Sequence, residues 1–182
     1  MRHLPWILIA TSFLLFSCEK SFKYNAEDIP PFEGLEAPAA GEGYQIHVDP
    51  FPVTPNFERE IFVRKEVGNK EDIFVNRFEV FCRPGTHHMI AYGYEEEDDP
   101  SYPHPPVGVM RDQNLPDGRH NFSLTMGSGA MYCGAQEPRF IQQFPEGVAV
   151  RIPANSTLDI NSHYFNRTDE MLFGEVFMNM YT

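Results

Sequence analysis

The sequence has few basic residues, few cysteines and no apolar run long enough for a confident membrane-spanning helix. Lys and Arg number 14 against 26 Asp and Glu, so the formal net charge is -12 at pH 7. Nucleic-acid binding needs a cationic face, and this charge therefore argues against nucleic acid as a partner. The sequence also lacks an internal repeat and the Gly-x-Ser-x-Gly signature of serine hydrolases.

The longest apolar run lies at the N-terminus, in residues 4–16, after the basic start Met1-Arg2-His3. A basic start, a short apolar stretch and a small residue before the cut are typical of a secretory signal peptide, here residues 1–17. Residues 15–18, Leu-Phe-Ser-Cys, resemble the lipobox of bacterial lipoproteins, in which the cysteine is acylated. We therefore expect Cys18 to anchor the protein to the bacterial cell envelope, at the outer membrane or cell surface. The alternative is an ordinary secretory signal with a chance cysteine.

The composition changes after Cys18. Residues 19–43 are rich in Pro, Glu, Ala and Gly and show little hydrophobic periodicity, which predicts a flexible tether over residues 18–43. Ordered structure is expected to begin at Tyr44. Residues 44–182 are enough for one domain with a sizeable core.

This domain is expected to be all-β. The 16 Phe and 16 Pro with 13 Gly indicate short strands joined by punctuated loops. Strand-like runs occupy residues 44–48, 60–67, 73–82, 88–94, 122–126, 131–133, 148–152, 158–165 and 175–181. They predict an antiparallel jelly roll or β-sandwich of about eight strands. The charges of residues 57–67 also suit a short helix. The acidic run 95–99 predicts a solvated loop, with a calcium site as the alternative.

Two cysteines remain within the domain, Cys82 and Cys133. An exported protein meets an oxidising compartment, so a disulfide between them is plausible. It would close a loop of about 50 residues and stabilise the fold by roughly 4 kcal/mol on the chain-entropy model. Two buried free thiols are the alternative that the sequence leaves open.

Three histidines of the domain are candidate metal ligands. Adjacent residues on a regular strand point to opposite faces, so His87 and His88 could share a ligand only if the preceding turn twists the backbone. The turn sequence Arg-Pro-Gly-Thr at 83–86 supplies that twist. His163 lies in the strand expected at residues 158–165. Alternation along this strand places Leu158 and Ile160 in the core and His163 on the polar face. Three imidazoles at one point would bind copper or zinc.

The alternative is that these three are ordinary surface or core histidines. The other histidines of the domain, His47, His104 and His120, are expected to lie at an edge or in solvated loops rather than to bind metal.

Residues 78–93, FEVFCRPGTHHMIAYG, resemble the His-His-Met segment of the copper type II, ascorbate-dependent monooxygenases. This is the family of the peptidylglycine α-hydroxylating and dopamine β-monooxygenases. Residues 144–148, FPEGV, resemble the loop before that family's next copper ligand, and residues 161–164, NSHY, resemble its His-Tyr segment. The resemblance runs in order over about residues 44–181 and covers the family's N-terminal domain.

The resemblance implies a jelly roll in which His87, His88 and His163 bind one electron-transfer copper, with ascorbate as the reductant. The chain would then be part of an oxidoreductase that hydroxylates a small-molecule or peptide substrate with O2. Two departures matter. The family's dense disulfide pattern is absent. Its second domain supplies a His-x-His pair and a Met for a second copper, and this sequence contains no His-x-His.

We therefore expect catalysis to need a second copper domain or a downstream chain. Two other readings stay open at this point. One is a copper-binding or carrier lipoprotein without catalysis. The other is a non-metal extracellular β-sandwich that acts as a binding module.

Overall fold

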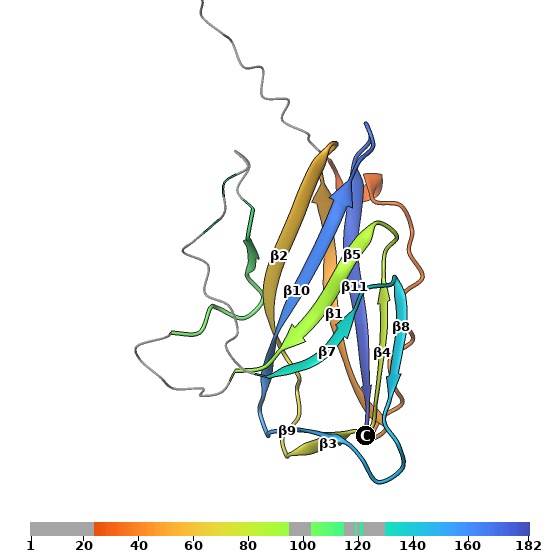
Figure 1. Ribbon diagram of the computed structural model, residues 1–182, viewed down its shortest axis with the longest axis vertical. Coiled ribbons are helices and arrows are strands. Elements are labelled where there is room, and N and C mark those ends of the chain that lie inside the picture. Colours follow the sequence, from red (N-terminus) through yellow and green to blue (C-terminus); the bar gives the residue numbers. More distant parts are fainter. Residues whose placement is uncertain (1–23, 95–102, 115–118, 120, 122–129) are drawn as a thin grey trace, which may run out of the picture.

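The computed structural model describes residues 24–94, 103–114, 119, 121 and 130–182. The chain forms eleven β-strands and one short 3-10 helix, and no α-helix occurs among these residues. Figure 1 shows the elements in order: η1 (Ala26–Asp28), β1 (Gly43–Val53), β2 (Phe57–Glu66), β3 (Ile73–Val75), β4 (Arg77–Cys82), β5 (Thr86–Tyr92), β6 (Met110–Asp112), β7 (Met131–Ala135), β8 (Arg139–Gln143), β9 (Val150–Ile152), β10 (Thr157–Asn166) and β11 (Leu172–Tyr181).

The strands form two antiparallel sheets that pack face to face. Sheet A has the order β1-β11-β4-β8, and sheet B has the order β6-β2-β10-β5-β7. A separate two-stranded pair joins β3 to β9. The expected all-β sandwich is confirmed, and the helix alternative for residues 57–67 is wrong because they form β2. The described residues form eleven strands rather than about eight, because the run expected at 73–82 is divided into β3 and β4 and because β6 and β8 were not expected.

Two sequence-based expectations cannot be placed on this fold. The strand expected at residues 122–126 and the acidic run at residues 95–99 both lie outside the described residues. Within the part of the chain that the structure describes, no helix is long and apolar enough to cross a membrane.

The core lies between the two sheets and follows strand alternation. Val176, Met178 and Met180 of β11 point inward from sheet A, and Leu158 and Ile160 of β10 point inward from sheet B. All five side chains are fully buried. A large buried aliphatic side chain contributes about 1.5–3 kcal/mol through removal of its surface from water, so this contact is the main source of stability.

Cys82 and Cys133 are free thiols, so the structure does not contain the disulfide considered above. Cys82 is on β4 of sheet A and Cys133 is on β7 of sheet B, and their exposed fractions are 0% and 1%. Both belong to the apolar core. Burial raises the pKa of each thiol to about 12. Both therefore stay protonated, and a protonated thiol is a poor nucleophile for disulfide exchange.

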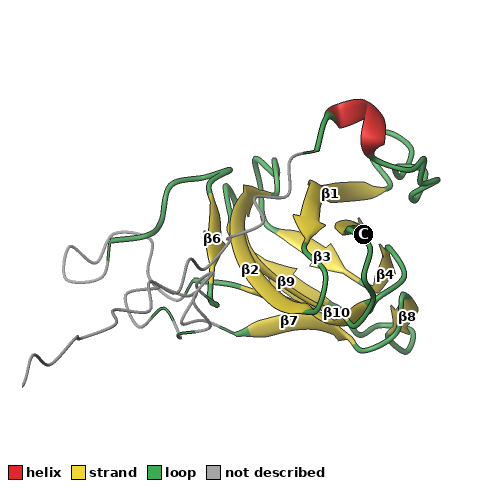
Figure 2. Ribbon diagram, turned by 90° about the horizontal axis from the view of Figure 1, so that it is seen from above, coloured by secondary structure: helices red, strands yellow, loops and turns green. Residues whose placement is uncertain are grey.

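The expected tether differs most from the structure. Residues 24–42, which we call the strap, pack along the outer face of sheet A. The Phe32 ring lies 4.8 Å from the Phe81 ring and 6.1 Å from the Phe177 ring, between centroids. Figure 2 shows η1 outside β1, on the side away from β2 and β10.

Side chains of the sandwich bind the backbone of the strap. Its carbonyls accept hydrogen bonds from Arg83 (to Pro30, 2.8 Å), Gln45 (to Leu35, 2.9 Å) and Asn179 (to Glu36, 2.8 Å). A segment without hydrophobic periodicity can be held in this way because the donors come from other strands. Composition alone does not reveal such partners, and this explains why the free-tether expectation fails over residues 24–42.

Tyr164 joins the two sheets through its hydroxyl group. The side chain is fully buried, and its oxygen lies 3.3 Å from the carbonyl of Arg83 and 3.2 Å from the carbonyl of Glu175. Tyr164→Phe removes the hydroxyl and leaves buried polar groups without that partner, so we expect the free energy of unfolding to fall by about 1–3 kcal/mol. Urea unfolding should show a lower midpoint at an unchanged m-value.

Tyr44→Phe is the matched control, because the described residues offer no hydrogen bond to that half-exposed hydroxyl. Equal losses in the two variants would contradict a role for the Tyr164 hydroxyl in joining the sheets.

Candidate metal centre

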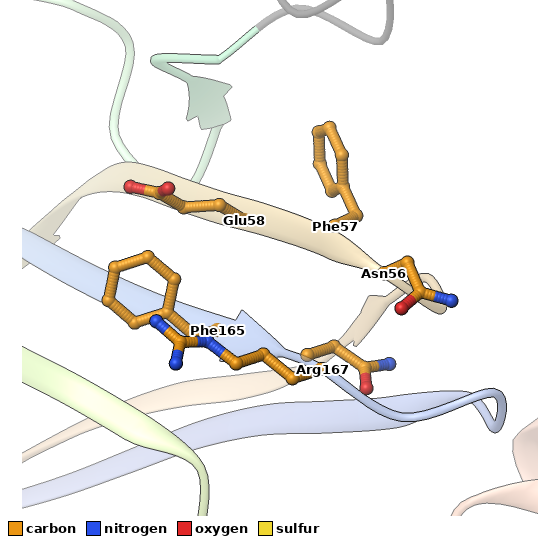
Figure 3. A pocket seen from close by; sticks show the side chains of 6 residues that line it. Asn56, Phe57, Glu58, Phe165 and Arg167 are labelled. Atoms are coloured by element: carbon orange, nitrogen blue, oxygen red, sulfur yellow. The ribbon is translucent and has the colours of Figure 1, made fainter.

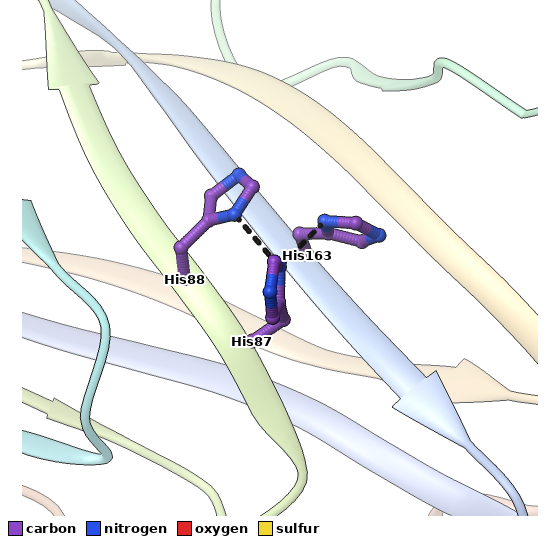
Figure 4. A group of neighbouring side chains, drawn as sticks. All are labelled: His87, His88 and His163. Atoms are coloured by element: carbon purple, nitrogen blue, oxygen red, sulfur yellow. Dashed lines mark hydrogen bonds between the residues drawn. The ribbon is translucent and has the colours of Figure 1, made fainter.

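An irregularity in the pairing of β5 with β10 brings both adjacent histidines to one face. His88 lies opposite His163, and the next pair is Thr86 with Tyr164, so His87 is an extra residue in β5. Such a β-bulge leaves one residue unpaired and turns its side chain. Both rings therefore project from the outer face of sheet B, beside the His163 ring from β10 (Figure 4). The twisted backbone expected from the turn sequence is present as this bulge.

The three Nδ1 atoms converge. The Nδ1 of His87 lies 3.1 Å from the Nδ1 of His88 and 3.3 Å from the Nδ1 of His163. One nitrogen from each ring can be chosen so that all three lie within 4.8 Å of one another. The structure thus groups the three histidines that the sequence predicts as ligands.

The opposite nitrogens of two rings are held by acceptors. The Nε2 of His163 lies 2.7 Å from a carboxylate oxygen of Glu58, and the Nε2 of His88 lies 2.8 Å from the side-chain oxygen of Asn161. Asn161 in turn donates to Glu60 over 2.9 Å. An acceptor at Nε2 places the proton there and leaves the lone pair on Nδ1, pointing into the cluster.

Lone pairs of neighbouring Nδ1 atoms repel one another at hydrogen-bond distance unless a proton or a cation lies between them. In the metal-free protein, a proton on the Nδ1 of His87 can fill this role for either neighbour. A metal ion that takes all three lone pairs displaces that proton.

Two of the three nitrogen–nitrogen separations fit one first-row transition metal. With metal–nitrogen distances of about 2.0–2.1 Å and angles of about 95–110°, two ligand nitrogens lie about 3.0–3.4 Å apart. The His87–His88 and His87–His163 separations, 3.1 Å and 3.3 Å between Nδ1 atoms, fall within this interval. Burial decreases from His163, which is 6% exposed, through the half-buried His88 to the exposed His87. The centre is therefore open to solvent on the His87 side.

Carboxylates give the centre a negative surrounding. The His88 ring, whose Nε2 lies 3.7 Å from Glu60, holds the pKa of Glu60 below its usual value. Glu60 in turn raises the pKa of His88. Burial lowers the pKa of His163, because a charged ring is poorly solvated there. The two carboxylates therefore favour a cation at this position.

Two hollows flank the cluster. One, of about 260 Å³, is bordered by Glu58 and Phe165 (Figure 3). The Phe165 ring lies 4.8 Å from the ring of His87 and 4.7 Å from the ring of His163, between centroids. The other, of about 540 Å³, is bordered by His88 and by apolar side chains that include Ile90 and Met131. Small molecules can therefore approach the ligands from two sides.

The remaining histidines do not join this cluster. His47 stacks on Phe177 and lies 2.9 Å from Glu175, on the outer face of sheet A. His104 is half-buried against the Tyr94 ring, with 4.2 Å between ring centroids, rather than in a solvated loop as expected. His120 lies outside the described residues.

Glu58 and Glu60 are the residues that sequence reasoning missed. Both lie on the outer face of β2, whose inward residues include Ile61 and Val63, so alternation could have placed them on the polar face. Their relation to the histidines depends on register, because Glu60 lies directly opposite His163 in the β2–β10 pair. A single sequence does not reveal that pairing.

No family model, curated protein or solved structure matches this chain. The functional argument therefore depends on the residues and on their geometry.

The opposite pKa shifts predict an order of protonation in the metal-free protein. On acidification, His88 should take up its proton at a higher pH than His163, and histidine ring signals in an NMR titration would show this order. Glu60→Gln should lower the pKa of His88, while Glu66→Gln, on the exposed end of the same strand, should leave it unchanged. The reverse order, or equal effects of the two variants, would contradict this electrostatic account.

The raised pKa of His88 determines how its contribution to the stability of the metal-free fold changes with pH. Its charged pair with Glu60 stabilises the metal-free fold below the unfolded pKa, and this contribution is lost as pH rises through the folded pKa. Metal binding has the opposite dependence, because the ligand nitrogen must be unprotonated.

Proposed function

We propose that this chain binds one copper ion through His87, His88 and His163. We further propose that it is the electron-transfer half of an ascorbate-dependent copper monooxygenase. The observation that supports this most directly is the convergence of three Nδ1 atoms, two of them on rings whose Nε2 atoms are already held. Three imidazoles suit copper and zinc alike, and Cu²⁺ binds most tightly among the divalent first-row ions. The resemblance of residues 78–93 and 161–164 to the family's ligand segments favours copper.

Bound copper would supply one-electron redox chemistry at this position. Glu58 orients the His163 ring, and Asn161 with Glu60 orients the His88 ring. Outer partners of this kind fix the tautomer and raise the basicity of the ligand nitrogen. The exposed ring of His87 gives a soluble donor such as ascorbate a route to the centre.

Hydroxylation requires more than this centre. Insertion of one oxygen atom of O2 into a C–H bond takes two electrons from the metals, and one copper provides one. Among the described residues, His87, His88 and His163 are the only group of three or more His, Cys, Asp or Glu side chains placed to hold a metal ion. We therefore propose that a second copper domain, or a downstream chain, binds substrate and oxygen.

The proposed location is the bacterial cell envelope, with the domain outside the cytoplasm. Residues 1–17 would be removed as a signal peptide, and Cys18 would carry the lipid. Several acyl chains, at about 0.8 kcal/mol per buried methylene, would hold the protein firmly at the membrane.

The ligand assignment is tested by single substitutions. Loss of an outer partner costs about 10–100-fold in metal affinity, so loss of a ligand in His163→Ala should cost at least about 100-fold. Competition titration with a Cu²⁺ chelator measures this change, and the nitrogen hyperfine pattern in the Cu²⁺ EPR spectrum should lose one imidazole. His47→Ala is the matched control, because His47 lies on the other sheet and should leave both readouts unchanged. Wild-type affinity and spectrum in His163→Ala would rule out the three-histidine centre.

The division of labour between two copper domains is tested by turnover. The isolated chain, loaded with one copper, should be reduced by ascorbate in an anaerobic optical or EPR assay. It should then give no hydroxylated product coupled to oxygen consumption, because the second electron and the substrate site are supplied elsewhere. Product equal to the oxygen consumed, with one copper bound, would overturn this division. Absence of reduction by ascorbate would instead favour a copper carrier without catalysis.

A further inference from the structure

The strap runs the full length of sheet A, from one end of the sandwich to the other. At its C-terminal end, the carbonyl of Glu42 accepts from the backbone N–H of Thr182, beside the last residues of β11. At its N-terminal end, the Tyr24 ring packs 5.5 Å from the ring of Phe173, at the first residues of β11. The ten residues of β11 separate these two points by about 30 Å.

The end at which the strap begins is also the end that carries the metal centre. Leu172 at the start of β11 pairs with Val53, and it packs against Gly85 in the turn that leads to His87. His163 lies three residues before the end of β10. Figure 1 shows η1 beside the tip of the sandwich where β10 ends and β11 begins.

The length of the remaining connection limits how far this end can move from the lipid. Tyr24 follows Cys18 by six residues, which span at most about 20 Å when fully extended. A free tether over residues 18–43 would instead have a root-mean-square length of about 28 Å and would let either end of the domain approach the membrane. The strap removes most of that freedom.

We propose that the metal-centre end of the sandwich faces the lipid bilayer, and that the partner of this surface is the membrane to which Cys18 is anchored. This inference rests on the lipid anchor in the proposed function. The net charge of -12 gives no attraction to anionic head groups, so the orientation comes from the short connection and the strap. Electron donors that reach the metal centre would then meet it in the layer next to the bilayer.

The test compares two probes at opposite ends of the lipidated protein in neutral phosphatidylcholine vesicles. Glu170→Cys places a label at the metal-centre end, and Glu146→Cys places the same label at the far end, on the turn after β8. Both positions are exposed, while the native thiols of Cys82 and Cys133 are buried and should not react. Energy transfer from the label to acceptor lipids should be about twofold higher at position 170, because the ends lie about 30 Å apart.

Two further variants separate the causes. A flexible insert of about 20 Gly and Ser residues after Lys20 should reduce the difference toward zero, because the domain can then turn freely. Cys18→Ser should abolish transfer at both positions. Equal transfer at both positions in the vesicle-bound protein would overturn the orientation alone. Failure of the protein to bind vesicles would overturn the anchor with it, while copper affinity, measured on the same sample, would still judge the metal centre.

Discussion

The candidate metal centre depends on one extra residue in the pairing of β5 with β10. In a regular strand, His87 would point into the space between the sheets when His88 points outward. The bulge places His87 beside His88 on the outer face and keeps Met89 in the core. A shift of one residue in this register would turn every side chain of β5 to the opposite face. The cluster is therefore a property of the backbone at the start of β5 as much as of its histidines.

A second constraint comes from burying polar groups on the outer face of β10. Asp159, Asn161 and His163 are 0%, 2% and 6% exposed, and a buried polar group without a partner costs about 1–3 kcal/mol. Neighbouring strands supply the partners. Arg111 of β6 forms an ion pair with Asp159. On β2, Glu58 accepts a hydrogen bond from His163 and Glu60 accepts one from Asn161. The hydrogen bonds that stabilise sheet B are thus the same ones that orient the ligand rings. A substitution that removes one of these hydrogen bonds would therefore affect both the stability of sheet B and the geometry of the candidate metal centre.

Hydrophobic alternation within single strands predicted much of the fold. The remaining features depend on which strands pair with one another, which a single sequence does not reveal. Alternation identified the all-β class and placed Leu158, Ile160 and His163 on their correct faces. It failed where strands are short or at an edge. β1 continues through the proline-containing residues 49–53, beyond the strand expected at residues 44–48, and it does so across a register shift because an edge strand tolerates prolines. The two glutamates around the histidines were missed for a related reason, since their contacts cross from β2 to β10.

The strap and the metal centre meet at Arg83, which ties the anchoring segment to the turn before the histidines. Its guanidinium donates to the carbonyl of Pro30 over 2.8 Å and to the buried carboxylate of Glu175 over 2.7 Å. It also lies 4.8 Å from the centre of the Phe32 ring. Arg83 directly precedes the Pro84-Gly85 turn that leads to β5, so the residue that binds the strap lies four residues before His87. The contacts that limit the reach of the domain therefore lie next to the turn that leads to the histidine pair.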